Sequence, residues 1–356
     1  MVKTTEQRLH LVIPGDLSTP TGGYVYDRRI ASGLQHLGWH LDLVELDASF
    51  PAPTATALDA AAARLDALED GALVLIDGLA LGAMPGVVAD QTHRLRLVGL
   101  IHHPLALETG LSVEQAEALR KSEKAALAAM RIVITTSAST ARSLADFGVS
   151  DDRIAVVRPG TDPAPLAKGN ADGALHLLCV AAVTPRKGHG LLIDALAALT
   201  DLDWRLTCIG SLDRSPETAA ALRQQIGERG LTERVQLAGA VGDDRLGKAY
   251  AEADLFVLPS LFEGYGMAFA EALAHGLPVL GCRAGAVPDT VPADAGVLVA
   301  PGSVPALREA LARLLTDAER RAGLAAGARR ARAALPDWGD SARRLAATLT
   351  KVLADD

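Results

Sequence analysis

Short apolar runs alternate with alanine- and leucine-rich stretches along this 356-residue chain. The runs are rich in Val, Ile and Leu, as expected for strands that are covered on both faces, and the stretches between them resemble helices. Strands that alternate with helices indicate an α/β fold built on mostly parallel sheets. In the first half, the expected strands are residues 9–13, 72–76, 95–101 and 132–134, and the expected helices are 24–37, 56–69, 113–129 and 138–147.

A segment rich in Pro and Gly, residues 158–165, interrupts this alternation. We therefore predict two doubly wound domains, residues 1–165 and 166–337, followed by a last helix that starts near Trp338. In such a protein a ligand is expected between the domains, at the carboxyl ends of the strands. After the interruption, strand-like runs recur at residues 175–180, 204–209, 235–237, 255–258 and 278–280.

The composition excludes several classes of protein. Hydrophobic residues make up 49% of the chain and charged residues 22%, the balance of a soluble globular protein. The formal net charge is −8 and aromatic residues make up only 3%, so a nucleic-acid partner is not expected. Residues 1–165 carry 14 Lys and Arg against 20 Asp and Glu, so docking to an anionic membrane is not indicated.

The cysteines and the apolar segments indicate a cytoplasmic location. Cys179, Cys208 and Cys282 lack the spacing of a metal site, and the first two lie in apolar runs typical of a core. Residues 1–15 lack the long apolar stretch of a signal peptide. The most apolar segment, residues 71–89, is broken by Asp77 and Pro85, so no membrane span is expected.

Residues 258–279 are the most informative segment for function. A strand is expected to end at Pro259, a loop then carries Glu263, and a helix is expected to begin near Met267 with Glu271 about one turn inside it. The start of a helix offers N–H groups to an anion, and carboxylates accept hydrogen bonds from sugar hydroxyls. Taken singly, Glu263 could be an ordinary loop acid and Glu271 an acid favoured by the helix dipole.

This segment resembles the nucleotide-sugar motif of retaining glycosyltransferases of family 4. The matching features are Pro-Ser, Glu-Gly-Tyr-Gly, a second Glu eight residues after the first, and Gly-Leu-Pro-Val. The resemblance covers nearly the whole chain and implies the GT-B fold, with two Rossmann-like domains that face each other across a cleft. Residues 1–165 would then bind the acceptor, residues 166–337 the nucleotide sugar, and residues 338–356 would form a helix that packs back on the first domain. Further segments that resemble the family are 157–162, 241–246, 284–289 and 295–302.

The resemblance assigns roles to the motif. Glu263 would contact the transferred sugar, Glu271 would hold the ribose hydroxyls, and the base would rest near Ala240 and Val241. The backbone between the two acids would face the sugar and the diphosphate; these residues are Gly264, Tyr265, Gly266, Met267 and Ala268.

Two adjacent cations, Arg186 and Lys187, follow the first strand of the second domain. A diphosphate leaving group needs neutralising charge, which Arg or Lys can supply. The family pattern matches at Lys187 and Gly188 but has an Arg where this chain has Ala182. We expect Arg186 and Lys187 to bind the diphosphate, with Arg186 a candidate replacement for the missing Arg.

In the first domain, His102 and His103 follow an expected strand. In the family a His in this position lies beside the donor sugar and the acceptor. His102 aligns best as the catalytic residue, whereas His103, expected at the acceptor, is the alternative. Near the amino terminus, Gly22 and Gly23 resemble the Gly-Gly loop that approaches the donor phosphates, and Tyr24 is expected at the acceptor.

The chain is thus expected to be a retaining glycosyltransferase that needs no cofactor and no metal ion. Its donor would be a UDP- or GDP-sugar, and its acceptor a soluble small molecule or saccharide. The alternatives are a GT-B sugar phosphorylase or epimerase, and a catalytically silent sugar-nucleotide-binding module, which the Ala182 departure favours. No oligomeric state is indicated.

Overall fold

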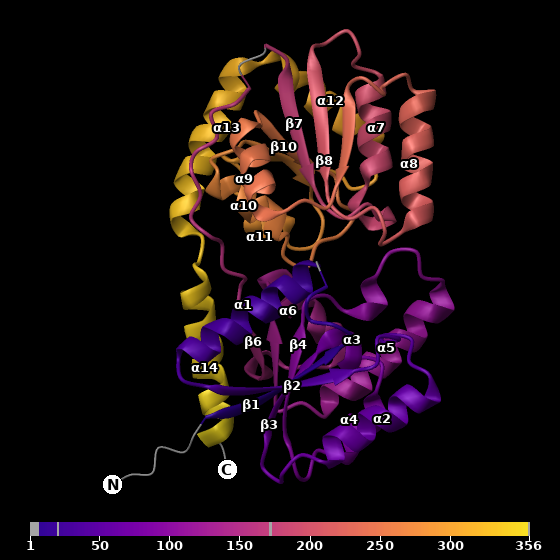
Figure 1. Ribbon diagram of the computed structural model, residues 1–356, viewed down its shortest axis with the longest axis vertical. Helices are drawn as coiled ribbons and strands as arrows, with labels where there is room; N and C mark the ends of the chain where they lie inside the picture. Colours follow the sequence, from indigo (N-terminus) through magenta and orange to yellow (C-terminus); the bar gives the residue numbers. More distant parts are fainter. Residues whose placement is uncertain (1–6, 20, 171–172, 355–356) are drawn as a thin grey trace. The chain divides into compact units, whose positions relative to one another are not determined.

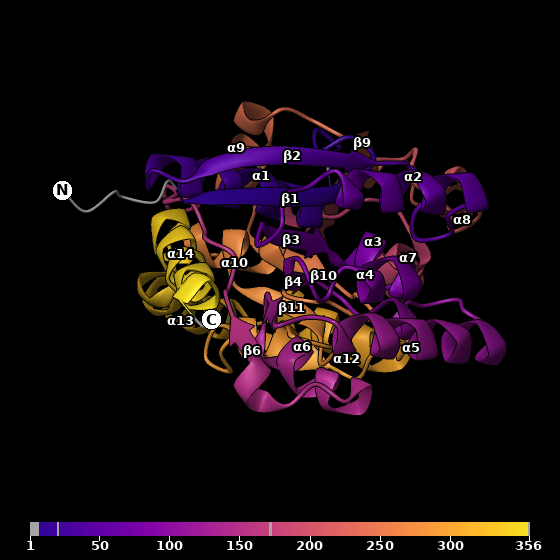
Figure 2. The same ribbon diagram turned by 90° about the horizontal axis from the view of Figure 1, so that it is seen from below.

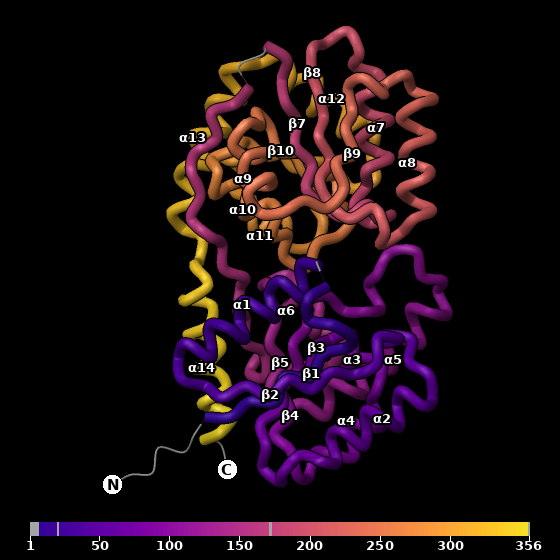
Figure 3. Tube along the Cα trace, viewed as in Figure 1, coloured from indigo at the N-terminus to yellow at the C-terminus, as the bar shows by residue number. Residues whose placement is uncertain are grey.

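The computed structural model describes residues 7–19, 21–170 and 173–354. The chain forms two compact units, each built on a six-stranded parallel sheet (Figure 1). Unit 1 contains residues 7–160 and 336–354, and unit 2 contains residues 161–335. These divisions lie close to the expected ones at 165 and 337. The backbone trace passes from unit 1 to unit 2 and later returns (Figure 3).

The sheet of unit 1 has the strand order β2-β1-β3-β4-β5-β6, and Figure 2 shows the first four of these strands following one another. Its strands are β1 (Arg8–Pro14), β2 (His40–Leu46), β3 (Leu73–Asp77), β4 (Arg96–Ile101), β5 (Ile132–Thr135) and β6 (Ile154–Val156). Its helices are α1 (Gly22–His36), α2 (Ala55–Asp66), α3 (Gly78–Leu81), α4 (Pro85–Asp90), α5 (Val113–Ala128), α6 (Ala138–Ser143) and α14 (Trp338–Ala354).

The sheet of unit 2 has the strand order β12-β11-β10-β7-β8-β9. Its strands are β7 (Leu175–Val180), β8 (Trp204–Ile209), β9 (Val235–Gly239), β10 (Leu255–Leu258), β11 (Val279–Cys282) and β12 (Gly296–Val299). Its helices are α7 (His189–Ala197), α8 (Pro216–Glu228), α9 (Asp243–Glu252), α10 (Met267–Ala274), α11 (Val287–Thr290), α12 (Val304–Thr316) and α13 (Ala318–Ala331). The predicted α/β class with parallel sheets is confirmed in both units.

Both faces of the unit 1 sheet are covered, which explains why its central strands are mostly apolar. In β3, Val74 and Ile76 belong to one hydrophobic cluster, whereas Leu73 and Leu75 belong to a second. Successive residues of a strand point to opposite faces, so every residue of β3 is buried. The edge strand β2 alternates polar and apolar residues instead.

The last helix, α14, packs against α1 within unit 1 (Figure 1). Leu345, Leu349 and Val352 follow a helical spacing and join the same hydrophobic cluster as β1. At the start of α14 two segments of the backbone come so close that a Cβ on Gly160 would lie 2.4 Å from the Trp338 nitrogen. Glycine is therefore required there. In the part of the chain that the structure describes, no helix is both long and apolar enough to cross a membrane.

Candidate functional site

Glu263 is the centre of a charged cluster in unit 2. It lies in the loop between β10 and α10, and only 5% of the residue is exposed. The Lys187 Nζ lies 2.7 Å from Glu263 Oε1, and the Ser260 hydroxyl donates to the same oxygen at 2.5 Å. The Arg186 Nη1 lies 3.7 Å from Oε2. Burial alone would raise the pKa of Glu263, but the two cations outweigh burial and hold that pKa below its ordinary value.

Backbone contacts position the two cations. Arg186 and Lys187 lie in a single turn that ends at Gly188, whose φ of +71° favours glycine. The Leu261 N–H donates to the Arg186 carbonyl at 2.8 Å, and the Arg186 Nη1 donates to the Phe262 carbonyl at 2.8 Å. The basic turn after β7 and the acidic loop after β10 are thus joined by hydrogen bonds as well as by charge.

Glycine also shapes the entry into α10. Gly266 precedes the helix with a φ of +86°, and a Cβ there would lie 2.7 Å from the Phe269 ring. The buried Thr290 hydroxyl donates to the Tyr265 carbonyl at 2.8 Å. Gly264, Met267 and Ala268 are half-buried, and Val241 packs against the unit 2 core. That these residues face a donor stays a prediction.

Glu271 lies in α10, in the part of the chain that follows Glu263. Its carboxylate is half-buried and accepts a hydrogen bond of 2.8 Å from the hydroxyl of Tyr250, a buried residue of α9. Burial raises the pKa of Glu271, although the Tyr250 hydroxyl opposes this. The sequence analysis assigned Tyr250 no role. The only sequence feature that pointed to Tyr250 was its place in the helix ahead of the motif.

In unit 1, His102 lies against two buried acids. Its Nε2 is 3.0 Å from Asp27 Oδ1 and 3.6 Å from Asp77 Oδ2. Burial lowers the pKa of His102, but the two carboxylates outweigh it and hold the pKa above its ordinary value. Burial, together with the Asp27 charge, raises the pKa of Asp77 to about 7. These contacts arise because Asp27 lies in α1, Asp77 ends β3, and His102 directly follows β4.

Other residues expected at the unit 1 site have different surroundings. A Cβ on Gly23 would lie 3.4 Å from the His102 ring, so Gly23 and His102 are neighbours, whereas Gly22 is exposed. The Tyr24 hydroxyl donates to the Pro14 carbonyl, so this buried side chain is held within its own unit. The His103 Nε2 lies 3.9 Å from Glu108 Oε2. The structure thus groups Gly23 with His102 and puts His103 beside a different acid.

Asp27 and Asp77 are not among the site residues predicted from the sequence. Asp77 ends β3, the neighbour of β4 in the sheet, and is paired in register with Leu100. Asp27 lies in α1, four residues after Gly23. An acid at the end of a buried strand, next to the strand that His102 follows, was the available signal.

Comparison with known proteins covers both units. A family profile described as Glycosyltransferase Family 4 matches residues 74–165, and one described as Glycosyl transferases group 1 matches residues 174–317. An MMP alpha-(1->4)-mannosyltransferase of Mycolicibacterium hassiacum is 28% identical over 335 residues, which are 88% of this chain and 80% of that protein.

Other relatives match over a shorter span. A D-inositol 3-phosphate glycosyltransferase of Pseudarthrobacter chlorophenolicus is 30% identical over 59% of this chain and 52% of its own length. A GDP-mannose-dependent alpha-(1-6)-phosphatidylinositol monomannoside mannosyltransferase of Mycobacterium tuberculosis is 32% identical over 48% of this chain and 46% of its own length. The chain thus matches about half the length of these two proteins.

Solved structures share the fold. The sucrose-phosphate synthase from Thermosynechococcus elongatus has a TM-score of 0.83 at 22% identity and covers 98% of this chain and 100% of its own. Anabaena HepE, solved in complex with UDP and glucose, has a TM-score of 0.75 at 19% identity, with 97% and 100% covered. The two-unit architecture is therefore the GT-B fold. With both units matched by profiles of one class of enzyme, the chain belongs to the group 1 glycosyltransferases of family 4.

Proposed function

We propose that this glycosyltransferase moves a sugar from a UDP- or GDP-sugar to the hydroxyl of a soluble saccharide or small molecule, with retention at the anomeric carbon and without a metal ion. The observation that carries the proposal is the cluster at Glu263, where two cations and a buried carboxylate meet at the start of α10. A donor with a polar sugar and a negative diphosphate needs both kinds of group.

In this proposal unit 2 binds the donor. Arg186, Lys187 and the start of α10 neutralise the diphosphate, which carries the charge that develops as it leaves. Glu263 accepts hydrogen bonds from the transferred sugar, and Glu271 accepts them from the ribose hydroxyls. The relatives support both bases, since one is named as GDP-mannose-dependent and HepE was solved with UDP.

Unit 1 binds the acceptor, and His102 acts on the transferred sugar. The bond between the anomeric carbon and the diphosphate oxygen breaks while the acceptor oxygen bonds to that carbon on the same face. The acceptor proton passes to the departing diphosphate. No protein nucleophile is required, so Glu263 acts as a hydrogen-bonding and charged group only.

The acidic balance of residues 1–165 supports a soluble acceptor, because it gives no attraction to anionic lipid. One relative is named for a phosphatidylinositol-linked acceptor, so the alternative is an acceptor that carries a lipid. Co-sedimentation with anionic liposomes at low salt separates the two. Liposome binding that disappears at high salt would overturn the proposal that the acceptor is soluble.

A thermal-shift screen in EDTA, with UDP, GDP, ADP and their sugar conjugates, tests the donor and the metal independence together. We expect stabilisation by one nucleotide series, since a ligand that binds only the folded state raises Tm. Nucleotide conjugates of mannose are the first to test, because a relative that matches 88% of this chain is named a mannosyltransferase. Stabilisation that appears only after Mg²⁺ or Mn²⁺ is added would contradict metal independence.

A catalytically silent sugar-nucleotide-binding module is the second candidate, and Ala182 in place of the family Arg favours it. It predicts a thermal shift without turnover. Slow release of free sugar from the stabilising donor, measured over hours, distinguishes the two functions without an acceptor, because a functional transferase activates its donor toward water. Unchanged donor would favour the silent module.

A further inference from the structure

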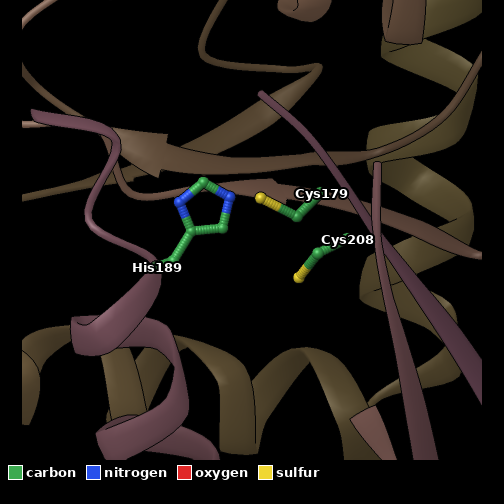
Figure 4. A group of neighbouring side chains, drawn as sticks. All are labelled: Cys179, His189 and Cys208. Carbon is green, nitrogen blue, oxygen red and sulfur yellow. The ribbon is translucent and has the colours of Figure 1, made fainter. Parts of the chain in front are cut away.

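Two cysteines and a histidine meet inside unit 2, close to Lys187 but with no member among the residues assigned to the donor. Cys179 of β7 and Cys208 of β8 are direct partners in the parallel register, and His189 is the first residue of α7. Figure 4 shows the His189 ring directed toward the Cys179 sulfur, with Cys208 beside it. One donor atom from each side chain lies within 4.8 Å of the others.

All three side chains are withdrawn from solvent. Cys179 is 0% exposed, Cys208 3% and His189 3%. Neither ring nitrogen of His189 makes a hydrogen bond within the described part of the chain. A buried polar group without a partner is costly, and native structures seldom keep one without a reason such as an ion.

We propose that Cys179, Cys208 and His189 bind one zinc ion, which stabilises unit 2. Thiolates and imidazole are the ligands that Zn²⁺ takes in proteins. Two thiolates and a neutral imidazole balance the charge of a divalent ion, and a buried site favours that neutrality. A monovalent ion would leave a net negative charge.

The distances require only a small adjustment. Zinc–ligand bonds of about 2.0–2.3 Å in tetrahedral geometry put the donor atoms roughly 3.3–3.8 Å apart. The donor atoms already lie within 4.8 Å of one another, so they must approach by at most about 1.5 Å to reach these separations.

The fold offers the ion a route of entry, and binding of the ion would have a structural consequence. His189 is among the residues that line a surface cavity of about 420 Å³, together with Thr184, Gly188 and Leu191. The ion would tie β7 and β8 to the start of α7, two residues after Lys187.

The test is a titration of the reduced, metal-free full-length chain with Co²⁺, a spectroscopic substitute for zinc. We expect one Co²⁺ per chain, a thiolate-to-cobalt charge-transfer band, loss of the band when Zn²⁺ is added, and a higher Tm with Zn²⁺. The titration of the wild-type chain decides by itself whether the metal site exists. A chain without this band does not contain the site.

Variants locate the ligands. Cys208→Ala and His189→Asn should weaken Co²⁺ binding by more than about 100-fold. Cys282→Ser is the matched control, since Cys282 is also a buried free cysteine but lies in β11. It should keep the band. A band that survives in a natively folded Cys208→Ala chain, or that disappears in Cys282→Ser, overturns the assignment.

Discussion

Lys187 and Glu263 form a partly buried ion pair, with Nζ and Oε1 2.7 Å apart, across two loops that are 76 residues apart in the sequence. Sequence analysis assigned Lys187 to the diphosphate and Glu263 to the sugar. The pair shows that both side chains are also held by each other. Each therefore has a structural contribution that must be separated from any role in catalysis.

Breaking this pair from one side should destabilise unit 2. Lys187→Met leaves the Glu263 carboxylate buried, with Arg186 as its remaining cation. We expect the free energy of unfolding to fall by about 3 kcal/mol, the lower end for a broken buried pair. Urea unfolding measures it. The double variant Lys187→Met/Glu263→Gln should lose less than the sum of the two single variants.

An exposed pair in the same unit provides the control. Lys248 and Glu252 lie 3.7 Å apart with 72% and 54% of their side chains exposed. Lys248→Met should cost less than about 1 kcal/mol. Equal losses in Lys187→Met and Lys248→Met would mean that the 2.7 Å pair contributes no more than a surface one.

Removing the Glu271 carboxylate should weaken donor binding without unfolding the chain. Charge-assisted hydrogen bonds to the ribose would be lost, so Glu271→Ala should reduce donor affinity by roughly 1–3 kcal/mol. Isothermal titration with the stabilising nucleotide measures this. Tyr250→Phe keeps the carboxylate but removes its 2.8 Å hydrogen bond, so its effect should be smaller. Unchanged affinity in Glu271→Ala would remove the ribose assignment.

The fold could be predicted because its signals are local. Apolar strands such as β3 are buried on both faces, and this pattern is visible in a few consecutive residues. β2 was not among the predicted strands, because an edge strand with alternating polar residues lacks that pattern. The nucleotide-sugar motif could be recognised for the same reason, because Glu263 and Glu271 belong to one continuous segment.

The clusters that sequence analysis missed are built by strand register. Asp77 reaches His102 only because β3 and β4 are paired, and Cys179 faces Cys208 only because β7 and β8 are paired. No spacing rule links such residues. The Cys179 and Cys208 thiols were predicted to be core residues, which their burial confirms, but their proximity to each other and to His189 needed the structure.

Unit 1 should lose stability as the pH rises through neutrality. The pKa of Asp77 is raised to about 7, so between roughly pH 4 and pH 7 the native state binds more protons at this group than the unfolded chain. The pKa of His102 is also raised, so its stabilising contribution is present below about pH 6.5 and is lost above. Asp77 and His102 act in the same direction, so the free energy of unfolding should fall as the pH rises through these values.

Hydrogen exchange of β3 and β4 peptides, in EDTA between about pH 5 and pH 8 with rates corrected for pH, reports on this unit. Asp77→Asn should flatten the dependence while its side-chain oxygen still accepts from the Leu79 N–H, as Asp77 does at 2.9 Å. Asp70→Asn is the control, since that side chain is 83% exposed. A wild-type protection that rises with pH would contradict the raised pKa of Asp77.

His102 and His103 should differ in their effect on turnover. His102 is held between Asp27 and Asp77, whereas His103 lies beside Glu108. We expect His102→Ala to reduce kcat by about 100-fold or more, as the loss of a group acting in the transition state does, with little change in donor affinity. His103→Ala should change mainly the KM for the acceptor. Donor turnover and nucleotide titration, measured on both variants, separate these effects. A larger loss of kcat in His103→Ala would move the catalytic role one residue along the chain.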